Sequence, residues 1–433
     1  MANKYTKAQQ KAIETLDKSV LVSAAAGAGK TTVLIDRIIG IILGGHANVD
    51  EMLVVTFTSA AAAEMRLRLG AAIRKRMREH PEDTKKMKEQ LSRLHRSYIS
   101  TIDSFAQRVV REFFYEIDME PEFSICDEVQ GELMKREAAS EMLEEAFEND
   151  SMIEGGSFRS FMRLYSDERS DETFITNLLK SYESLRTMPD YFEWAYKKAE
   201  DLRTGKDEIG STGIYEAMLE DARDVFDNAC SGCRIIREMM DDAGLSALFE
   251  RKLASESDAI NDIFRTLKEK GTDSTLFDAI DNINYDKLVA NKEEKESYEP
   301  IKAEIKAIRE AYKKDIASFA SRYASPDFDT CISEMNATYE YTVYYLRMLE
   351  EFERRYSEKK REKRLLDFSD ITHAAARILK KEEAAETLRK RFRYVFVDEY
   401  QDTNNLQEYL IGKVSRPRNV FKVGDVKQSI YKF

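Results

Sequence analysis

The sequence predicts an α/β fold: a parallel sheet with helices on both faces, interrupted by a large all-helical insertion. Short apolar runs that suit buried parallel strands lie near the start of the chain, at Val20–Val22 and Met52–Thr56. Similar runs return only near the end, at Tyr394–Val397 and Val420–Val423. Between these groups the apolar residues follow a helical spacing almost throughout, and 433 residues are enough for several folding units.

The composition narrows the class of protein. Hydrophobic residues make up 42% and charged residues 34%, which excludes a disordered chain, and only 17 glycines and 6 prolines favour long helices. A net charge of −12 gives no general basic field, so any nucleic-acid contact would need local clusters of Lys and Arg. No apolar run approaches the ~18–20 residues of a membrane span, and the N-terminus lacks a signal-peptide pattern. We therefore expect a cytoplasmic protein.

Four cysteines are present, and two of them, Cys230 and Cys233, form a CxxC pair. No second pair lies at a metal-ligand spacing. We interpret them as incidental intracellular thiols, with a zinc or redox role as the alternative.

The first part of the chain alternates helices and strands. We expect a helix over Tyr5–Leu16 with Thr6 as its N-cap, and a break at Gly44-Gly45 after the second helix. The further expected elements are a helix over Ser59–Met77, a strand over Tyr98–Thr101 and a helix over Ser104–Tyr115.

The insertion is predicted over 116–364, so that 1–115 and 365–433 together form the sheet domain. It begins with an acidic stretch, Glu116–Asp150, which contains 13 acidic residues and 2 basic residues. We interpret this stretch as a solvated helix face; repulsion of DNA or docking of a partner are the alternatives. A long helix over Thr330–Arg364 ends the insertion, and no convincing strand is expected between Asp150 and about Arg364.

A loop of small residues follows the first strand and precedes an apolar helix. Such a loop lets backbone N–H groups surround a phosphate at the positive end of the helix dipole. Lys30 would reach the β- and γ-phosphates of a nucleotide, and the Thr31 hydroxyl would bind Mg²⁺. An ordinary strand–turn–helix corner is the alternative. The predicted nucleotide-binding residues here are Ala24, Ala25, Ala26, Gly27, Ala28, Gly29, Lys30, Thr31 and Thr32.

Two carboxylates, Asp398 and Glu399, follow the strand at Tyr394–Val397. Because parallel strands deliver their carboxyl ends to one edge, Asp398 would face the metal ion and Glu399 would activate the attacking water. Gln428, after the last strand, would sense the γ-phosphate, although a surface-loop role is equally compatible with its position.

The chain also resembles superfamily 1 DNA helicases of the UvrD/Rep type, and among them the AddA subunits of bacterial AddAB (RexAB) helicase–nucleases. The motifs that carry this resemblance are YTKAQQKAI, AAAGAGKTT, VVTFTSAAAAEM, STIDSFAQRV, DFSDI, VFVDEYQDTNNLQ and GDVKQSIYKF. It implies a RecA-like ATP-binding lobe, the cofactors ATP and Mg²⁺, single-stranded and duplex DNA as ligands, and an AddB-type partner subunit. For the full-length protein it implies 3'-5' helicase and exonuclease activity in recombination and DNA repair.

The resemblance also assigns residues. Gln9 would read adenine, and Asp398, Glu399, Lys30 and Gln428 would form the catalytic set. The implied DNA contacts are Thr56, Phe57, Thr58, Ser59, Thr101, Ser104, Phe105 and Tyr431. Exposed aromatic rings suit this task because every base has a π-face, whereas without the resemblance Phe57 and Phe105 would be interpreted as core residues.

Three positions depart from the family pattern: Ala24 stands in place of a glycine, Ser59 in place of an asparagine and Asp103 in place of a histidine. The sequence ends at Phe433, where the family continues into a second RecA-like lobe with an arginine finger and AddA then into a nuclease domain. We therefore expect weak ATP binding, very slow turnover and no unwinding by this chain alone. The alternatives are a stand-alone UvrD/PcrA-type repair helicase and a nucleotide-switched scaffold protein without motor activity.

Overall fold

The computed structural model describes residues 5–25, 27–117, 119, 123–165, 171–205, 209–269, 275–323 and 328–425. By compactness the chain divides into two units, Met1–Ala195 with Tyr344–Phe433, and Tyr196–Val343. The predicted boundary of the insertion at 116–364 stays a prediction.

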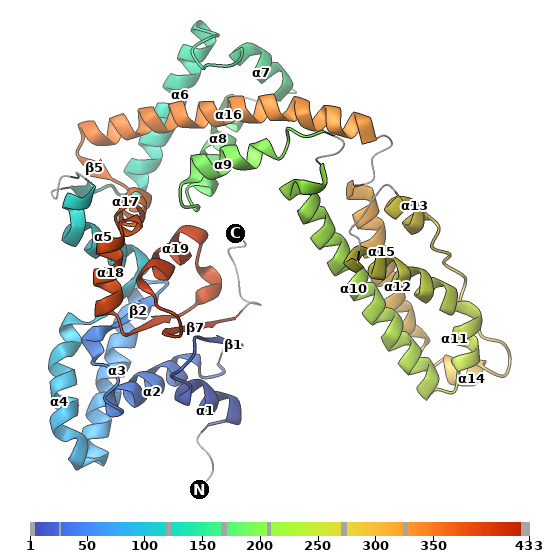
Figure 1. Cartoon of the computed structure of the whole chain (residues 1–433), viewed down its shortest axis with the longest axis horizontal. Helices are drawn as coiled ribbons and strands as arrows, with labels where there is room; N and C mark the ends of the chain where they lie inside the picture. Colours follow the sequence, from blue (N-terminus) through green and yellow to red (C-terminus); the bar gives the residue numbers. More distant parts are fainter. Residues whose placement is uncertain are drawn as a thin grey trace. The chain divides into compact units, whose positions relative to one another are not determined.

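A five-stranded parallel sheet lies at the centre of the first unit (Figure 1). Its strands are β1 (Val20–Ser23), β2 (Met52–Thr56), β3 (Tyr98–Thr101), β6 (Tyr394–Val397) and β7 (Val420–Gly424), in the spatial order β1-β7-β6-β2-β3. All five lie where the sequence predicts them, and the predicted fold class is confirmed. Because all pairs are parallel, the loops that follow these strands start from one edge of the sheet.

Helices cover both faces of this sheet. They are α1 (Lys7–Glu14), α2 (Lys30–Leu43), α3 (Ser59–Glu79), α4 (Thr84–Arg93), α5 (Ile102–Phe113), α17 (Phe368–Lys380), α18 (Glu382–Arg391) and α19 (Asn405–Val414). Alternate residues of β2 separate the two cores. Leu53 and Val55 pack with α5, α17, α18 and α19, whereas Met52 and Val54 pack with α2, α3 and α4.

Side-chain caps fix several helix starts. Thr6 and Gln9 form a reciprocal capping box at α1, as the predicted N-cap at Thr6 requires. The helix expected from Ser104 starts two residues earlier, at Ile102, because the Thr101 hydroxyl accepts the Ser104 N–H at 3.1 Å. Single 3₁₀ turns occur at Val49–Glu51, Pro81–Asp83, Leu94–Arg96, Phe114–Glu116, Ile209–Ser211 and Tyr400–Asp402.

Part of the predicted insertion belongs to the unit that contains the sheet. Its helices are α6 (Glu128–Glu148), α7 (Phe158–Tyr165), α8 (Asp171–Leu185), and the segments of α9 (Tyr191–Glu200) and α16 (Phe328–Glu362) that fall within this unit. A short parallel pair, β4 (Ser124–Ile125) and β5 (Leu365–Leu366), was not predicted, because two residues per strand are too few to give a sequence pattern. Both strands lie outside 150–364, the range in which no strand was expected, and the described residues of that range contain none.

The described residues of the second unit form helices joined by loops, with no strand, and have their own apolar core. Its complete helices are α10 (Gly213–Asp242), α11 (Ser246–Lys252), α12 (Ala254–Glu269), α13 (Thr275–Asp281), α14 (Lys295–Tyr298) and α15 (Lys302–Tyr323). Cys230 and Cys233 lie on α10, and burial raises the pKa of both thiols to about 11. Burial therefore disfavours the thiolate form, which is the form that binds a metal ion.

Candidate nucleotide and DNA site

The loop after β1 is attached to the neighbouring strand and shaped by two glycines. The Ala24 N–H donates to the carbonyl of Gly424 at the end of β7, with an N···O distance of 3.0 Å. Gly27 and Gly29 have φ values of +77° and +80°, a left-handed conformation that residues with a Cβ rarely adopt. Gly29 then caps α2, so Lys30 and Thr31 are its first residues. Ala26 lies outside the described residues.

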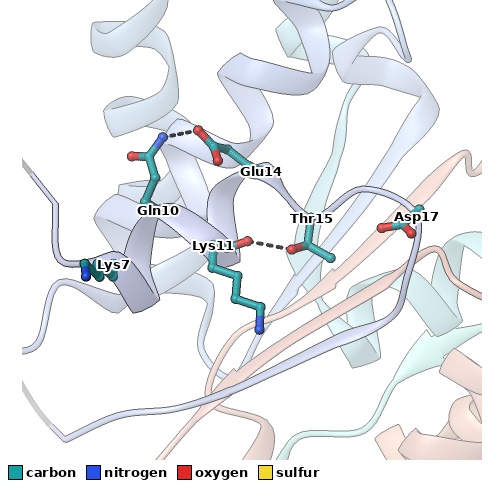
Figure 2. Close-up of a pocket in the computed structure, with 6 residues that line it drawn as sticks. All are labelled: Lys7, Gln10, Lys11, Glu14, Thr15 and Asp17. Atoms are coloured by element: carbon teal, nitrogen blue, oxygen red, sulfur yellow. Dashed lines mark hydrogen bonds between the residues drawn. The ribbon is translucent and has the colours of Figure 1, made fainter.

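Gln9 contacts this loop directly. Its side-chain amide donates to the Ala28 carbonyl at 3.0 Å, while its carbonyl oxygen accepts the Thr6 N–H at 2.9 Å. The predicted adenine-reading residue therefore lies beside the loop, fixed by the capping box of α1. Figure 2 shows a depression of about 500 Å³ lined by residues of α1 and of the turn after it, including Lys7, and by none of the predicted site residues.

The two carboxylates predicted at the end of β6 lie at the same edge as the loop. The Asp398 N–H continues the sheet ladder by donating to the Val55 carbonyl at 2.9 Å. The Lys30 Nζ lies 3.3 Å from Glu399 Oε2, and the exposed fractions of the two side chains are 9% and 39%. Two residues at opposite ends of the sequence are thus brought into contact by the strand order.

Glu399 adopts a backbone conformation that is unusual for its residue type. Its φ is +51°, in the left-handed region, where a non-glycine residue stores about 1–3 kcal/mol of strain. The conformation turns the chain from β6 into the 3₁₀ turn at Tyr400–Asp402 and directs Glu399 toward Lys30. Strain of this kind is typical of functional sites.

Negative charge is concentrated at this position. Burial, and then the neighbouring Glu399, raise the pKa of Asp398 above its usual value. The same two causes, in the same order, raise the pKa of Asp402. Lys30 is the only cation that forms an ion pair with Asp398, Glu399 or Asp402 in the described part of the chain. A divalent cation would relieve this excess of carboxylates, and the Thr31 hydroxyl and Asp398 are suitable oxygen ligands.

Gln401 is a site residue that was not predicted from the sequence. Its amide nitrogen donates to Glu399 Oε2 at 2.9 Å, and its carbonyl oxygen accepts the Asp425 N–H at 2.8 Å. A Cβ on Gly424 would lie 2.6 Å from the same carbonyl oxygen, so glycine is required for this close approach. Gln401 therefore connects the ends of β6 and β7. Its place in the VFVDEYQDTNNLQ motif was the available signal. Gln428 and Tyr431 lie outside the described residues.

The predicted DNA-contacting residues after β2 lie at the same edge of the sheet. Phe57 is 47% exposed, so its ring is at the surface rather than in the core. The Thr58 hydroxyl caps α3 by accepting the Ala61 N–H at 3.1 Å, and Ser59 begins that helix. Thr56 is buried, and its hydroxyl donates to the Thr58 carbonyl at 3.0 Å. These hydroxyls stabilise the turn that presents Phe57.

The residues after β3 divide differently. Thr101 caps α5, and its hydroxyl donates to the Ser104 hydroxyl at 2.9 Å. Phe105 is only 1% exposed and packs edge-on against Phe392, with ring centroids 6.0 Å apart. The prediction that Phe105 contacts DNA is therefore corrected: its ring belongs to the core between α5 and the sheet, because it lies on the inward face of an amphipathic helix.

A small cavity of about 130 Å³ connects the two groups of residues. Thr56 and Phe57, at the end of β2, line it together with Asp398 and Glu399, which follow β6. Asp103, the residue that departs from the family pattern, also lines it, and burial raises the pKa of its carboxyl group. Asp103 thus shares this cavity with the carboxylates of Asp398 and Glu399.

The comparisons with known proteins agree with this arrangement. The family model described as the UvrD/REP helicase N-terminal domain matches residues 5–209 and 216–433. This chain belongs to that helicase family. Along 99% of its length it is 34% identical to an ATP-dependent helicase/nuclease subunit of Alkaliphilus oremlandii, and 35% identical to the protein of the same name in Clostridium botulinum. The match covers 35% of the length of each of these two relatives. A third relative with the same name, from Lachnoclostridium phytofermentans, is also 34% identical, and the match covers 32% of its length.

The predicted membership of the UvrD/Rep-type family is thereby confirmed, and so is the predicted similarity to AddA subunits. The chain spans about a third of the length of these relatives. The use of ATP follows for the relatives from their names. No helix in the described ranges combines the length and the hydrophobicity needed to cross a membrane.

Proposed function

We propose that this chain forms the ATP-binding motor lobe of an ATP-dependent DNA helicase and nuclease that processes DNA ends. The observation that carries the proposal is the contact between Lys30 and Glu399 at 3.3 Å, at the edge where the loop after β1 meets the acidic end of β6. The lobe is assigned to 1–115 and 365–433, and the helical insertion to 116–364.

Each polar group at this edge has a task in ATP hydrolysis. Lys30 would bind the terminal phosphates when nucleotide separates it from Glu399. Thr31 and Asp398 would hold Mg²⁺, which neutralises phosphate charge when bound. Glu399 would then be released to orient and deprotonate water, and Gln401 would keep its carboxylate in place.

Coupling to DNA follows from the adjacent edge. Phe57 would stack on a base of a single strand, with Thr58, Ser59, Thr101 and Ser104 near its phosphates. The cavity shared by Thr56, Phe57, Asp398 and Glu399 gives a short physical connection between strand binding and hydrolysis. Tyr431 and Gln428 would complete the DNA and γ-phosphate contacts. The same proposal includes a cytoplasmic location and an AddB-type partner subunit.

The test is ATP hydrolysis with and without single-stranded oligodeoxythymidylate, in this chain and in a longer protein that contains it. We expect Mg²⁺-dependent ATP binding by this chain, slow turnover, and stimulation by the oligonucleotide in the longer protein. Absence of any stimulation, together with normal DNA processing by a Lys30→Ala variant of the longer protein, would contradict the proposal and favour a nucleotide-switched scaffold.

A further inference from the structure

A second, larger cavity lies in the unit that contains the sheet, away from the loop after β1. It has a volume of about 750 Å³ and is lined by the end of α16, by α17, and by residues before β4 and after α8. We call it the α16–α17 cavity. Its size falls in the range of small-ligand sites, about 300–1,000 Å³.

The carboxylates of this cavity are already satisfied by basic or hydroxyl groups of the protein. Asp190 pairs with Lys380 at 2.5 Å, and Asp370 pairs with Lys360 at 2.5 Å and with Arg186 at 3.0 Å. Glu353 accepts hydrogen bonds from the hydroxyls of Tyr182 and Tyr191. None of these three acidic groups is left to neutralise further basic residues.

Three arginines that line the cavity remain in surplus: Arg361, Arg364 and Arg377. Within the described ranges, no carboxylate lies within ion-pair distance of any of them. A helix dipole accounts for a cation near the end of α16 or of α17, but not for three guanidinium groups at one cavity. In a chain of net charge −12, such a cluster favours an anion that accepts several N–H donors, as phosphate does.

The cavity also offers apolar and aromatic surface beside these arginines. Phe123 and Leu366 line it and pack on the core beneath, and Tyr191 contributes an aromatic ring. A pocket that joins these three arginines to flat apolar surface suits a ligand with a phosphate and a ring. Inorganic phosphate alone would leave the apolar part unused.

We propose that the α16–α17 cavity binds a nucleotide unit, with its phosphate on Arg361, Arg364 and Arg377 and its base against Phe123. The unit can come from a free nucleotide or from a DNA strand. None of the described residues proposed to contact DNA lines this cavity. It is therefore distinct from the DNA contacts proposed above and does not depend on the motor function.

The test compares two charge-matched triple variants in a Lys30→Ala background, which removes the phosphate-binding lysine of the other site. One variant is Arg361→Gln, Arg364→Gln and Arg377→Gln. The control is Arg74→Gln, Arg78→Gln and Arg96→Gln, three exposed arginines that have no ion pair in the described part of the chain. The probes are a fluorescent twelve-residue oligodeoxythymidylate, measured by anisotropy across a salt series, and free dTMP, measured by calorimetry. Thermal melting checks that both variants fold.

We expect the cavity variant to lose at least tenfold in affinity for one of the probes, and the control less than twofold. If DNA is the source, the salt slope should fall by about 2, since each lost phosphate contact on a single strand contributes about 0.7. Loss of dTMP binding alone would identify a free nucleotide as the source. Equal effects of the two triple variants, or no binding of either probe by the parent, would overturn the proposal. If the three arginines bind an acidic protein instead, neither probe will bind to the parent.

Discussion

The ends of β1 and β6 differ from the ends of β2 and β3 in how their polar groups are used, although all four strands end at one edge of the sheet. At the ends of β1 and β6, called the nucleotide side after the proposed function, charged side chains contact each other across the fold, as Lys30 and Glu399 do. At the ends of β2 and β3, called the DNA side for the same reason, hydroxyl groups such as those of Thr58 and Thr101 cap the following helices. The first arrangement needs distant segments to meet, whereas the second is local.

Because of this difference, substitutions on the two sides should have different consequences. Removing a charge on the nucleotide side should change chemistry while leaving the fold intact, because Glu399 is partly exposed and has no role in the core. On the DNA side, the effect of a substitution should depend on whether the ring is exposed or buried.

The largest effect is expected for Glu399→Gln. The amide preserves the size of the side chain but cannot accept a proton from water, so hydrolysis should fall by about 10²–10⁴-fold. Affinity for ATP should be unchanged or slightly higher, since Lys30 loses a competing carboxylate. Single-turnover hydrolysis of radiolabelled ATP measures the first quantity, and binding of a fluorescent ATP analogue measures the second. A fall in hydrolysis below tenfold would exclude Glu399 as the base.

The next effect distinguishes the two phenylalanines of the DNA side. Phe105→Ala should lower the free energy of unfolding by about 3–5 kcal/mol, because it leaves a cavity in the core beside Phe392. Phe57→Ala should leave stability nearly unchanged and weaken single-strand binding by about 1–3 kcal/mol. Urea unfolding and anisotropy of a labelled oligonucleotide give the two numbers. Equal stability losses would show that Phe57 is also a core residue.

A smaller effect is expected for Gly424→Ala. The new Cβ would meet Gln401 Oε1 at 2.6 Å and two backbone nitrogens at 3.3 and 3.4 Å. Relief of this clash requires Gln401 to move, at a cost of about 1–3 kcal/mol in stability. The hydrogen bond from Gln401 to Glu399 should then weaken and slow hydrolysis. Gly412→Ala, on an exposed face of α19 with no atom near the new Cβ, is the control.

The smallest effect concerns pH and His373, which lines the α16–α17 cavity and lies outside the nucleotide and DNA sides. Burial, and then Arg186, lower the pKa of His373 to about 4, while its Nε2–H donates to the Arg186 carbonyl at 3.0 Å. The unfolded chain therefore takes up a proton below about pH 6.5, whereas the folded chain does so only near pH 4. Neutral His373 therefore contributes fully to the free energy of unfolding above pH 6.5, and this contribution is lost as the pH falls from 6.5 to 4.

His373→Gln should flatten the stability curve in this window by at most about 1.4 kcal/mol per pH unit. Urea unfolding at pH 4.5, 5.5 and 7 measures the slope. An unchanged slope in the variant would show that other groups cause the acid sensitivity.

The sheet was predictable because its strands are short apolar runs followed by small or acidic residues, and those patterns do not depend on the rest of the fold. The meeting of the loop after β1 with the carboxylates after β6 followed from the rule that parallel strands share an edge, whereas the ion pair between Lys30 and Glu399 was not predicted. The burial of Phe105 was also predictable from spacing, because the apolar residues of α5 recur every three or four positions on one face of the helix. The prediction that Phe105 contacts DNA came from the resemblance instead, and the packing of its ring against Phe392 shows that the helical spacing was the better guide. The role of Gln401 was not predictable, because it depends on the close approach of Gly424.

Nucleotide binding at the loop after β1 can be measured with a fluorescent ATP analogue on this chain, on Lys30→Ala and on Lys7→Ala, with Mg²⁺ and with a chelator. Lys7 is an exposed lysine on α1, outside the proposed nucleotide site, and serves as the matched control (Figure 2). We predict binding that requires Mg²⁺, is reduced at least tenfold by Lys30→Ala and is unchanged by Lys7→Ala. Equal affinity of all three proteins, or binding that is unaffected by the chelator, would contradict an ATP site at this loop.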